Sequence, residues 1–460
     1  MTTMDTVETV EAVEAVEKDK ELDRLFEIYE ELRETTRIWG LCEDWDEDEA
    51  RRLREEAVLL NHQRYLRKIP AYRTLAEELD IGDDLTDVET IKIDLMSTDD
   101  IFKSYDPALI DEADWQGMTS WLRKICDSEI PGDFSATKTM DEWFKKLAEA
   151  EIHVVSSSGT SGNYSFVPRD PLTREAAIIN SGRVFEPVFS KLGEDPMGYD
   201  AALLGFRSAA TGVQIGSNAI ANVVKDAYFL FDMDMPADAV RILQRGPSSE
   251  EERERIEEFQ RLLVTEKDAR YNEVLERMRA SVEKGQKVLV NGACYQVKEL
   301  CTMAAEQGGI ILPEGSLLLF GGGWKSFEDE RIDRDELLKL IDTCFGLRGD
   351  DTVEGYSMTE ITTAMTCCEH GRFHIPPLLE PMVFDEGLMP LPGGNREGIF
   401  GFLDPFALSY PGFLITGDFI DLRHGECRCG KKGHAINGEI RRAPGKEVKG
   451  CGGIMASVRA

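Results

Sequence analysis

One stretch about a third of the way along the chain joins an apolar segment directly to a loop of hydroxyls and glycines. Val154 and Val155 have the character of a strand end, and Ser156–Gly162 follow without a break. Glycines let the backbone turn tightly and present its N–H groups, while Ser and Thr add donors with little bulk. The loop therefore suits an anion such as a nucleotide phosphate. It is not a G-x-x-x-x-G-K-[ST] loop, because no Lys follows the second glycine, and an ordinary surface turn stays open as the alternative.

Short apolar runs alternate with helical segments after this loop. We expect strands at 201–206, 228–231, 287–291 and 317–320, and helices at 171–192 and 249–284, the last of them a charged, solvated surface helix. This alternation predicts an α/β fold with mostly parallel sheets covered by helices. Ligands of such sheets bind at the carboxyl ends of the strands. Gly321–Gly323 directly follow a predicted strand and lie at such an end.

Three further motifs follow the hydroxyl loop in order: Gly321–Lys325, Glu354–Glu360 and Thr416–Asp418. Each has a structural explanation when taken alone, since glycines and a Gly-Asp pair are common in turns. Together the four stretches resemble the adenylate-forming superfamily, which includes acyl-CoA synthetases, peptide-synthetase adenylation domains and beetle luciferases. The Gly-Gly-Gly-Trp-Lys form is similar to the acyl-protein synthetases (long-chain-fatty-acid–protein ligases) of bioluminescence operons. Residues 62–73 look like the entry helices of phenylacetate-CoA ligase relatives.

The resemblance implies a fold and a nucleotide site. The fold is an adenylate-forming core of mostly parallel sheets, with a helical N-terminal wrapper and a truncated C-terminal lid. The phosphates would be held by Ser157, Ser158, Gly159, Thr160, Ser161 and Gly162, with Arg169 replacing the usual Lys. The adenine and the acyl group would lie against Gly321, Gly322, Gly323 and Tyr356, and Ser357, Met358 and Thr359 belong to the same motif as Tyr356. Asp418 would bind the ribose, and Glu360 would bind Mg²⁺. Tyr356 has a flat face for stacking on adenine, and a carboxylate is a hard ligand for Mg²⁺.

The end of the chain carries the candidate residues for the remaining chemistry. The sequence ends 42 residues after Asp418, too few for a full lid with its catalytic Lys. The resemblance leaves Arg441 or Arg442 as the hinge Arg, and Lys325 or Lys446 as the replacement for that Lys. It also implies that Cys451 accepts the acyl group as a thioester. Nearby lysines favour a thiolate and glycines leave it accessible, although an exposed, inert Cys is the alternative.

A second set of soft ligands lies in two neighbouring regions of the sequence. Cys427 and Cys429 form a tight pair, and Cys367, Cys368 and His374 stand upstream. Two Cys from one loop with a Cys and a His from another match a closed tetrahedral site for structural Zn²⁺. Cys367 and Cys368 stay open as alternatives for the third thiolate, and reduced structural thiols are the alternative for the whole set.

Charge and cysteine usage restrict the class of protein. A formal charge of −34 argues against nucleic acid and anionic membrane surfaces as partners. Ten Cys without a signal-like N-terminus indicate thiols in a reducing compartment, so we expect a cytoplasmic protein. Without a long apolar run, we expect no membrane insertion. We divide the chain into an acidic, disordered tail (1–20), a helical region (21–150), an adenylation core (151–420) and a C-terminal segment (421–460).

The sequence therefore predicts an enzyme, an acid–thiol ligase. It would use ATP and Mg²⁺ to convert a carboxylic acid into an acyl-adenylate and pass the acyl group to a thiol on Cys451, a partner protein or CoA. One alternative is an aryl- or acyl-CoA ligase of the phenylacetate type. Another is a non-catalytic scaffold stabilised by zinc. The sequence does not specify the acid, the final acceptor or the oligomeric state.

Overall fold

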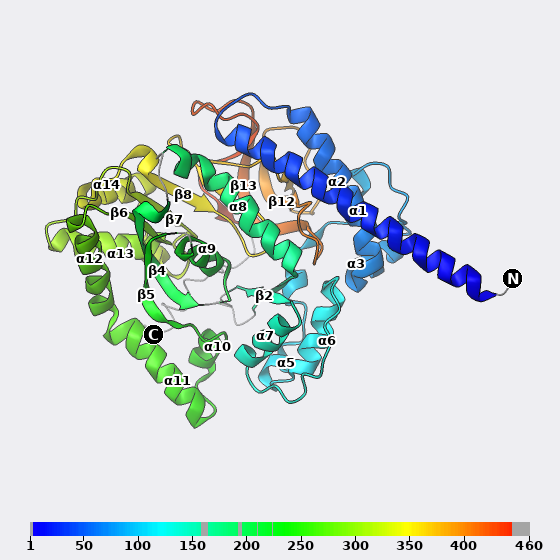
Figure 1. Ribbon diagram of the computed structural model, residues 1–460, viewed down its shortest axis with the longest axis horizontal. Helices are drawn as coiled ribbons and strands as arrows, with labels where there is room; N and C mark the ends of the chain where they lie inside the picture. Colours follow the sequence, from blue (N-terminus) through cyan, green and yellow to red (C-terminus); the bar gives the residue numbers. More distant parts are fainter. Residues whose placement is uncertain (1–2, 158–163, 192–195, 209, 223, 444–460) are drawn as a thin grey trace.

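A large mixed sheet, covered by helices, organises the computed structural model (Figure 1). The structure describes residues 3–157, 164–191, 196–208, 210–222 and 224–443. Within them, thirteen strands form one sheet, whose main path runs β11-β12-β13-β14-β10-β9-β8-β7-β6-β4-β5, and β2 and β3 form a separate hairpin. The α/β fold class predicted from the sequence is confirmed.

One half of the sheet is parallel and has helices on both faces. Its strands, in spatial order, are β5 (Asp226–Asp234), β4 (Tyr199–Ser208), β6 (Lys287–Ala293), β7 (Leu317–Gly321) and β8 (Thr352–Tyr356). Alternate residues along a strand point to opposite faces, so a strand covered on both sides is apolar throughout. This requirement explains the continuous apolar runs in the sequence.

The helices that cover the parallel half divide between its two faces. One face packs against α8 (Pro171–Lys191) and α9 (Gly212–Ala221). The other packs against α10 (Ala239–Arg245), α11 (Glu250–Gln260), α12 (Lys267–Glu283), α13 (Cys294–Glu306) and α14 (Arg334–Phe345). The helix expected at 249–284 is therefore two helices joined by a π-helical turn, Arg261–Thr265. Its apolar face, including Phe259 and Leu275, is buried, so only its outer face is a solvated surface.

The other half of the sheet is antiparallel, and here the expectation of mostly parallel strands does not hold. Its strands are β9 (Met365–Cys367), β10 (Arg372–His374), β11 (Glu380–Phe384), β12 (Arg396–Leu403), β13 (Phe413–His424) and β14 (His434–Asn437). The short loops between successive strands leave no room for a crossover helix, so they impose antiparallel pairing. β13 also pairs with two short strands, β1 (Ser97–Thr98) and β15 (Arg441–Arg442).

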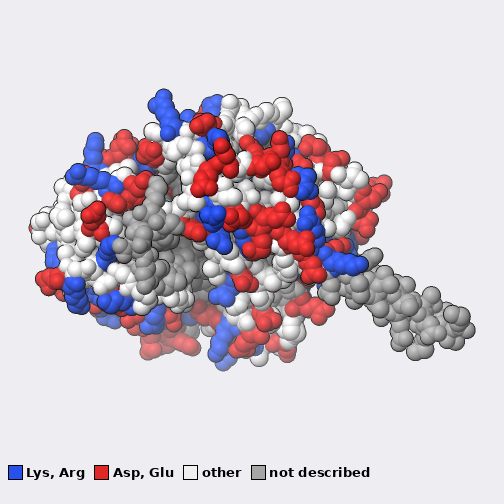
Figure 2. All heavy atoms as spheres, turned by 45° about the horizontal axis from the view of Figure 1, so that its top comes forward, with Lys and Arg blue, Asp and Glu red and all other residues white. Residues whose placement is uncertain are grey.

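The N-terminal part of the chain is mostly helical and wraps around the antiparallel half. Its helices are α1 (Thr3–Gly40), α2 (Glu47–Lys68), α3 (Pro70–Glu78), α4 (Glu89–Asp94), α5 (Pro107–Asp111), α6 (Trp115–Ile125) and α7 (Met140–Glu149), with a 3-10 turn at Asp99–Lys103. Leu25, Ile28 and Leu32 of α1 pack with Phe406 and Leu408 of the core. Figure 2 shows Asp and Glu side chains gathered on one face of the molecule. Among the described helices, none combines the length and apolar character of a membrane span.

Candidate active site

Two of the motifs meet directly at the junction of the two halves of the sheet. Tyr356 is the last residue of β8, and its hydroxyl donates a 2.7 Å hydrogen bond to Asp418 Oδ2 on β13. Arg442 on β15 lies opposite Asp418 in the strand register and donates to its other oxygen at 2.8 Å. Burial, with Asp418 close by, raises the pKa of Tyr356 well above its ordinary value. The phenol therefore stays protonated and holds the Asp418 carboxylate in a fixed orientation.

The two candidate hinge arginines have different surroundings. Neighbouring residues of a strand point to opposite faces. Arg442 accordingly binds Asp418, whereas the guanidinium of Arg441 lies 5.3 Å from the centre of the Phe419 ring. The structure thus brings Arg442, and not Arg441, together with Asp418 and Tyr356.

Glu360 follows Tyr356 by four residues and lies in a buried, negatively charged environment. Its pKa is raised to about 7, chiefly by burial and also by the nearby charges of Asp99 and Asp418. The ammonium of Lys103 acts in the opposite direction, and it lies 2.7 Å from Asp100 and 3.9 Å from Asp99. A buried carboxylate that feels the charges of two other carboxylates suits a divalent cation, because the cation relieves their repulsion. These residues fit the Mg²⁺ ligand that the sequence predicts.

Lys103 and Asp99 come from the N-terminal wrapper, and the sequence analysis gave neither of them a role. Burial lowers the pKa of Lys103, but the hydrogen bond to Asp100 and the charges of Asp99 and Glu360 outweigh it, so the pKa is raised. The Lys103 side chain is only 13% exposed. The pairing of β1 with β13 brings this segment to the site. The sequence feature that could have indicated a role for Lys103 is the apolar pair directly before it, in Ile101-Phe102-Lys103.

Arg169 holds the backbone of the loop that carries Glu360. It lies at the end of β3 (Phe166–Arg169), is 4% exposed, and donates to the carbonyls of Thr359 and Ile361 at 2.9 and 3.0 Å. The hydroxyl of Tyr410 donates to the Glu360 carbonyl at 3.1 Å. These bonds fix the position of the loop. The contacts of Arg169 are with this loop, and the structure assigns it a positioning role there.

The remaining residues of this motif are less tightly enclosed. Ser357 is exposed, and its hydroxyl donates to the carbonyl of Thr363 at 3.0 Å. Met358 packs against the core of the antiparallel half. Thr359 is half-buried, and its carbonyl is the one that Arg169 binds.

The hydroxyl loop begins at the same edge of the sheet. β2 (His153–Ser156) pairs with β3, and the backbone N–H and hydroxyl of Ser156 both donate to Ala210, just beyond the carboxyl end of β4. Ser157 accepts from the Ser165 N–H at 3.0 Å. Ser158, Gly159, Thr160, Ser161 and Gly162 lie outside the described residues. The described ends of the loop thus lie at the carboxyl edge, where a ligand of this sheet would bind.

The glycine motif reaches this edge from the next strand. Gly321 ends β7 opposite Gly355 of β8, and a Cβ on it would lie 2.3 Å from the Gly355 carbonyl oxygen. Gly322 and Gly323 have φ values of 79° and 64°, a region that glycine adopts without strain. Only glycine at position 321 permits this approach of the two strands. The side chain of Lys325 lies outside the described part, as do Cys451 and Lys446.

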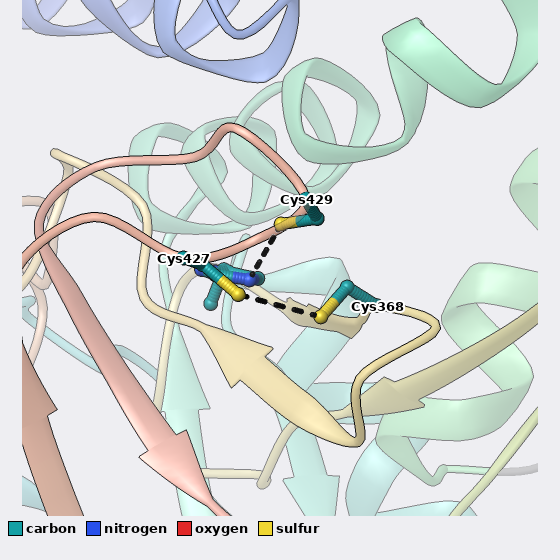
Figure 3. Close-up of side chains that lie close together, drawn as sticks. Cys368, Cys427 and Cys429 are labelled. Atoms are coloured by element: carbon teal, nitrogen blue, oxygen red, sulfur yellow. Dashed lines mark hydrogen bonds between the residues drawn. The ribbon is translucent and has the colours of Figure 1, made fainter.

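Three cysteines and one histidine form a separate cluster. Cys427 and Cys429 come from the loop between β13 and β14, and Cys368 from the turn after β9 (Figure 3). Sγ of Cys368 lies 3.9 Å from Sγ of Cys427, and Sγ of Cys429 lies 3.3 Å from Nε2 of His374. One ligand atom from each of the four lies within 4.8 Å of the others. A Zn²⁺ ion with bonds of about 2.0–2.3 Å gives tetrahedral edges of about 3.3–3.8 Å, so this set fits zinc.

Cys367 is not part of this cluster. It is buried, and burial raises its pKa to about 12. In contrast, the hydrogen bond with Cys429 lowers the pKa of Cys368, which favours the thiolate that a metal requires. Of the two alternatives left open by the sequence, the structure places Cys368 in the cluster with His374, Cys427 and Cys429.

Comparison with known proteins gives these sites a context. The family model described as "Acyl-protein synthetase, LuxE" matches residues 266–458. The long-chain-fatty-acid–luciferin-component ligase of Vibrio harveyi is 29% identical over 191 residues, which is 41% of this chain and 50% of that protein. The enzyme of the same name from Aliivibrio fischeri is 29% identical over 144 residues, 31% of this chain and 37% of that protein. Over this C-terminal part the chain is similar to the acyl-protein synthetases.

The similarity to acyl-protein synthetases covers the glycine motif, the Tyr356–Asp418 pair and the cysteine cluster, while the hydroxyl loop lies outside residues 266–458. The chain spans half or less of the length of these curated relatives. A solved structure of 2-hydroxyisobutyryl-CoA ligase in the postadenylation state matches with a TM-score of 0.50 and 14% identity. The match covers 88% of this chain and 74% of the ligase chain. This match shows that the chain shares the fold of that ligase, as the sequence predicted.

Proposed function

We propose that this protein uses ATP to convert a carboxylic acid into an acyl-adenylate and then passes the acyl group to a thiol. The main support is the meeting of Tyr356 and Asp418 beside Glu360, at the junction where the carboxyl end of β8 meets β13. Two separate motifs of one resemblance therefore share one site. The similarity to long-chain-fatty-acid–luciferin-component ligases supports a carboxylic acid substrate.

In the proposed reaction, a carboxylate oxygen attacks the α-phosphorus of ATP and pyrophosphate leaves. A thiolate then attacks the acyl carbonyl and AMP leaves. The residues bind and orient the reactants and stabilise their charge. Asp418 accepts hydrogen bonds from the ribose hydroxyls, oriented by Tyr356 and Arg442. The ring of Tyr356 stacks on adenine, and the charge of Lys103 acts on the phosphates. Mg²⁺ bound at Glu360 would neutralise phosphate charge.

The first thiol acceptor in this proposal is Cys451. It lies outside the described residues, so the proposal rests on the sequence around it and on the family similarity that extends to residue 458. The lysines at 446 and 449 favour a thiolate. The acyl group would then pass to a second thiol, on a partner protein or on CoA.

Acid-dependent exchange between ATP and labelled pyrophosphate tests the first step. Fatty, aromatic and amino acids are supplied separately, and at least one should support exchange. If none does, the proposed function is wrong and a scaffold role remains. Mass spectrometry of the intact protein tests the second step. An acyl group retained on Cys451, and lost in Cys451→Ser with exchange unchanged, supports self-acylation. If Cys451→Ser retains full thioester output with CoA, the protein is a CoA ligase of the phenylacetate type.

The cluster of Cys368, His374, Cys427 and Cys429 is proposed to hold a structural Zn²⁺. Its four donors leave no open coordination position for a substrate. The ion would join the turn after β9 to the loop between β13 and β14. Zinc analysis of the purified protein by atomic emission should give one equivalent.

A further inference from the structure

A second group of metal-ligating side chains lies at the base of the same β13–β14 loop. It consists of Glu47, His424 and His434, which we call the His-His-Glu cluster. Nε2 of His424 lies 2.6 Å from Oε1 of Glu47, and the two imidazole rings are 4.6 Å apart between centroids. One ligand atom from each residue lies within 4.8 Å of the other two. The set contains no thiol, which separates its chemistry from that of the cysteine cluster.

Regular structure holds each member of the His-His-Glu cluster. His424 ends β13 and His434 begins β14, and the two are directly opposite in the antiparallel register. Residues in such a pair have Cβ atoms about 4.5–5.5 Å apart on one face of the sheet. Glu47 is the first residue of α2, whose start is fixed by the Asp46 side chain accepting from the Glu49 N–H. Two strands and a helix start thus bring the three donors together.

The cluster borders a cavity of about 720 Å³, so a bound ion would have access to solvent and to small ligands. Carboxylates predominate in the lining, which includes Asp44, Asp46, Asp48 and Glu380 besides Glu47. Of the two arginines in this lining, Arg54 lies 2.7 Å from Glu380, and Arg51 pairs with Asp48. These pairs, and that of Asp44 with Lys432, compensate part of the charge, but five carboxylates against two arginines in the lining still favour a cation.

An ion pair between Glu47 and His424 explains two of the three side chains but leaves His434 without a role. The two imidazole rings, tilted by 52° to each other, repel each other when both are charged, so a surface ion pair gains nothing from the second ring. Two imidazoles and one carboxylate form a donor set typical of sites for Zn²⁺ and other divalent transition metals that keep open positions. Donors of a bound ion lie about 3.0–3.6 Å apart. Small side-chain rotations would bring the three atoms to this spacing.

We propose that Glu47, His424 and His434 bind a divalent transition-metal ion such as Zn²⁺, with open coordination positions toward the cavity. The ion joins the start of α2, in the N-terminal wrapper, to the β13–β14 hairpin of the core. This site does not depend on the proposed ligase activity. With three protein donors it is also the more readily exchanged of the two metal sites, because the cysteine cluster supplies four.

Cobalt titration of protein that holds one equivalent of Zn²⁺, bound at the cysteine cluster, tests this proposal. Co²⁺ at the His-His-Glu cluster gives visible d–d absorption without the thiolate-to-cobalt charge transfer expected at the cysteine cluster. We expect one equivalent to bind in this way, and at least ~10-fold weaker binding in His434→Ala and Glu47→Gln, since loss of one ligand of three removes a large part of the affinity. Glu49→Gln is the matched control, because Glu49 lies on the same helical turn but pairs with Arg52. It should bind Co²⁺ as the wild type does.

Thermal unfolding provides a second measurement that does not require replacement of the half-buried His434. His424 is 40% exposed, so His424→Ala should fold normally. Added Zn²⁺ should raise the Tm of the zinc-loaded wild type, as a ligand that binds only the folded state does, and should not raise that of His424→Ala. Unchanged Co²⁺ affinity in His434→Ala, absorption that shows thiolate charge transfer alone, or an equal Tm shift in His424→Ala would each overturn the proposal.

Discussion

Replacing Glu360 with Gln should stabilise the protein, by an amount that grows with pH. In the folded state the pKa of Glu360 is about 7, compared with 4.5 for an ordinary Glu. At about 1.36 kcal/mol per pH unit, this difference corresponds to about 3 kcal/mol. The folded state keeps its proton to higher pH than the unfolded chain. Ionisation of Glu360 therefore lowers the free energy of unfolding as pH rises from about 4.5 to about 7, and Gln does not titrate.

Urea unfolding of both proteins from pH 4.5 to 8.5 measures this effect. The variant should gain stability relative to the wild type across pH 4.5–7, by about 3 kcal/mol at most, and the difference should be constant above this range. Glu369→Gln is the control, since that side chain is 55% exposed and its replacement should give no such pH dependence. Pyrophosphate exchange should be lost in Glu360→Gln if the carboxylate binds Mg²⁺. A stability difference that is the same at pH 5 and pH 8 would refute the assignment of a buried, raised-pKa carboxyl.

Three other replacements test the nucleotide site and the cysteine cluster. Tyr356→Phe removes the hydrogen bond to Asp418. Because a hydrogen bond to a charged group contributes about 1.5–3 kcal/mol, kcat/KM for ATP in the exchange assay should fall about 10- to 100-fold. Lys103→Ala should lower the exchange rate by at least ~10-fold through loss of charge at the phosphates, and Lys103→Arg should restore part of it; equal rates in both variants would exclude an electrostatic role. Cys429→Ser should lose zinc on atomic emission and unfold at a lower temperature, whereas the buried Cys126, outside the cluster, should be replaceable by Ser without loss of zinc.

The parallel half of the fold could be predicted because its signals are local. The apolar runs at 287–291 and 317–320 are strands, and the glycines that follow the second run are at the carboxyl end of β7. The antiparallel half could not be predicted in the same way. The pairing of these strands depends on contacts between segments that are distant in the sequence. The alternation of apolar and polar residues within one strand does not indicate which strand is its partner.

The candidate site shows the same division between local and long-range information. The motif residues Tyr356 and Asp418 meet as the order of motifs suggested. Adjacent alternatives such as Cys367 and Cys368 stayed open because the phase of a three-residue strand decides which side chain points into the cluster. Glu47 and His424 are 377 positions apart, and no spacing rule joins them. These two residues are brought together by the packing of α2 on the β13–β14 hairpin.

β13 has a consequence for how inhibition by chelators should be interpreted. This strand carries Asp418 near its middle and leads into the loop that holds Cys427 and Cys429. Six residues of extended chain separate Asp418 from His424, about 20 Å at 3.3 Å per residue. A zinc chelator that loosens the loop would therefore disturb Asp418, the proposed ribose ligand, through the strand itself. Loss of turnover on treatment with such a chelator is thus expected even when the zinc of the cysteine cluster takes no part in bond making.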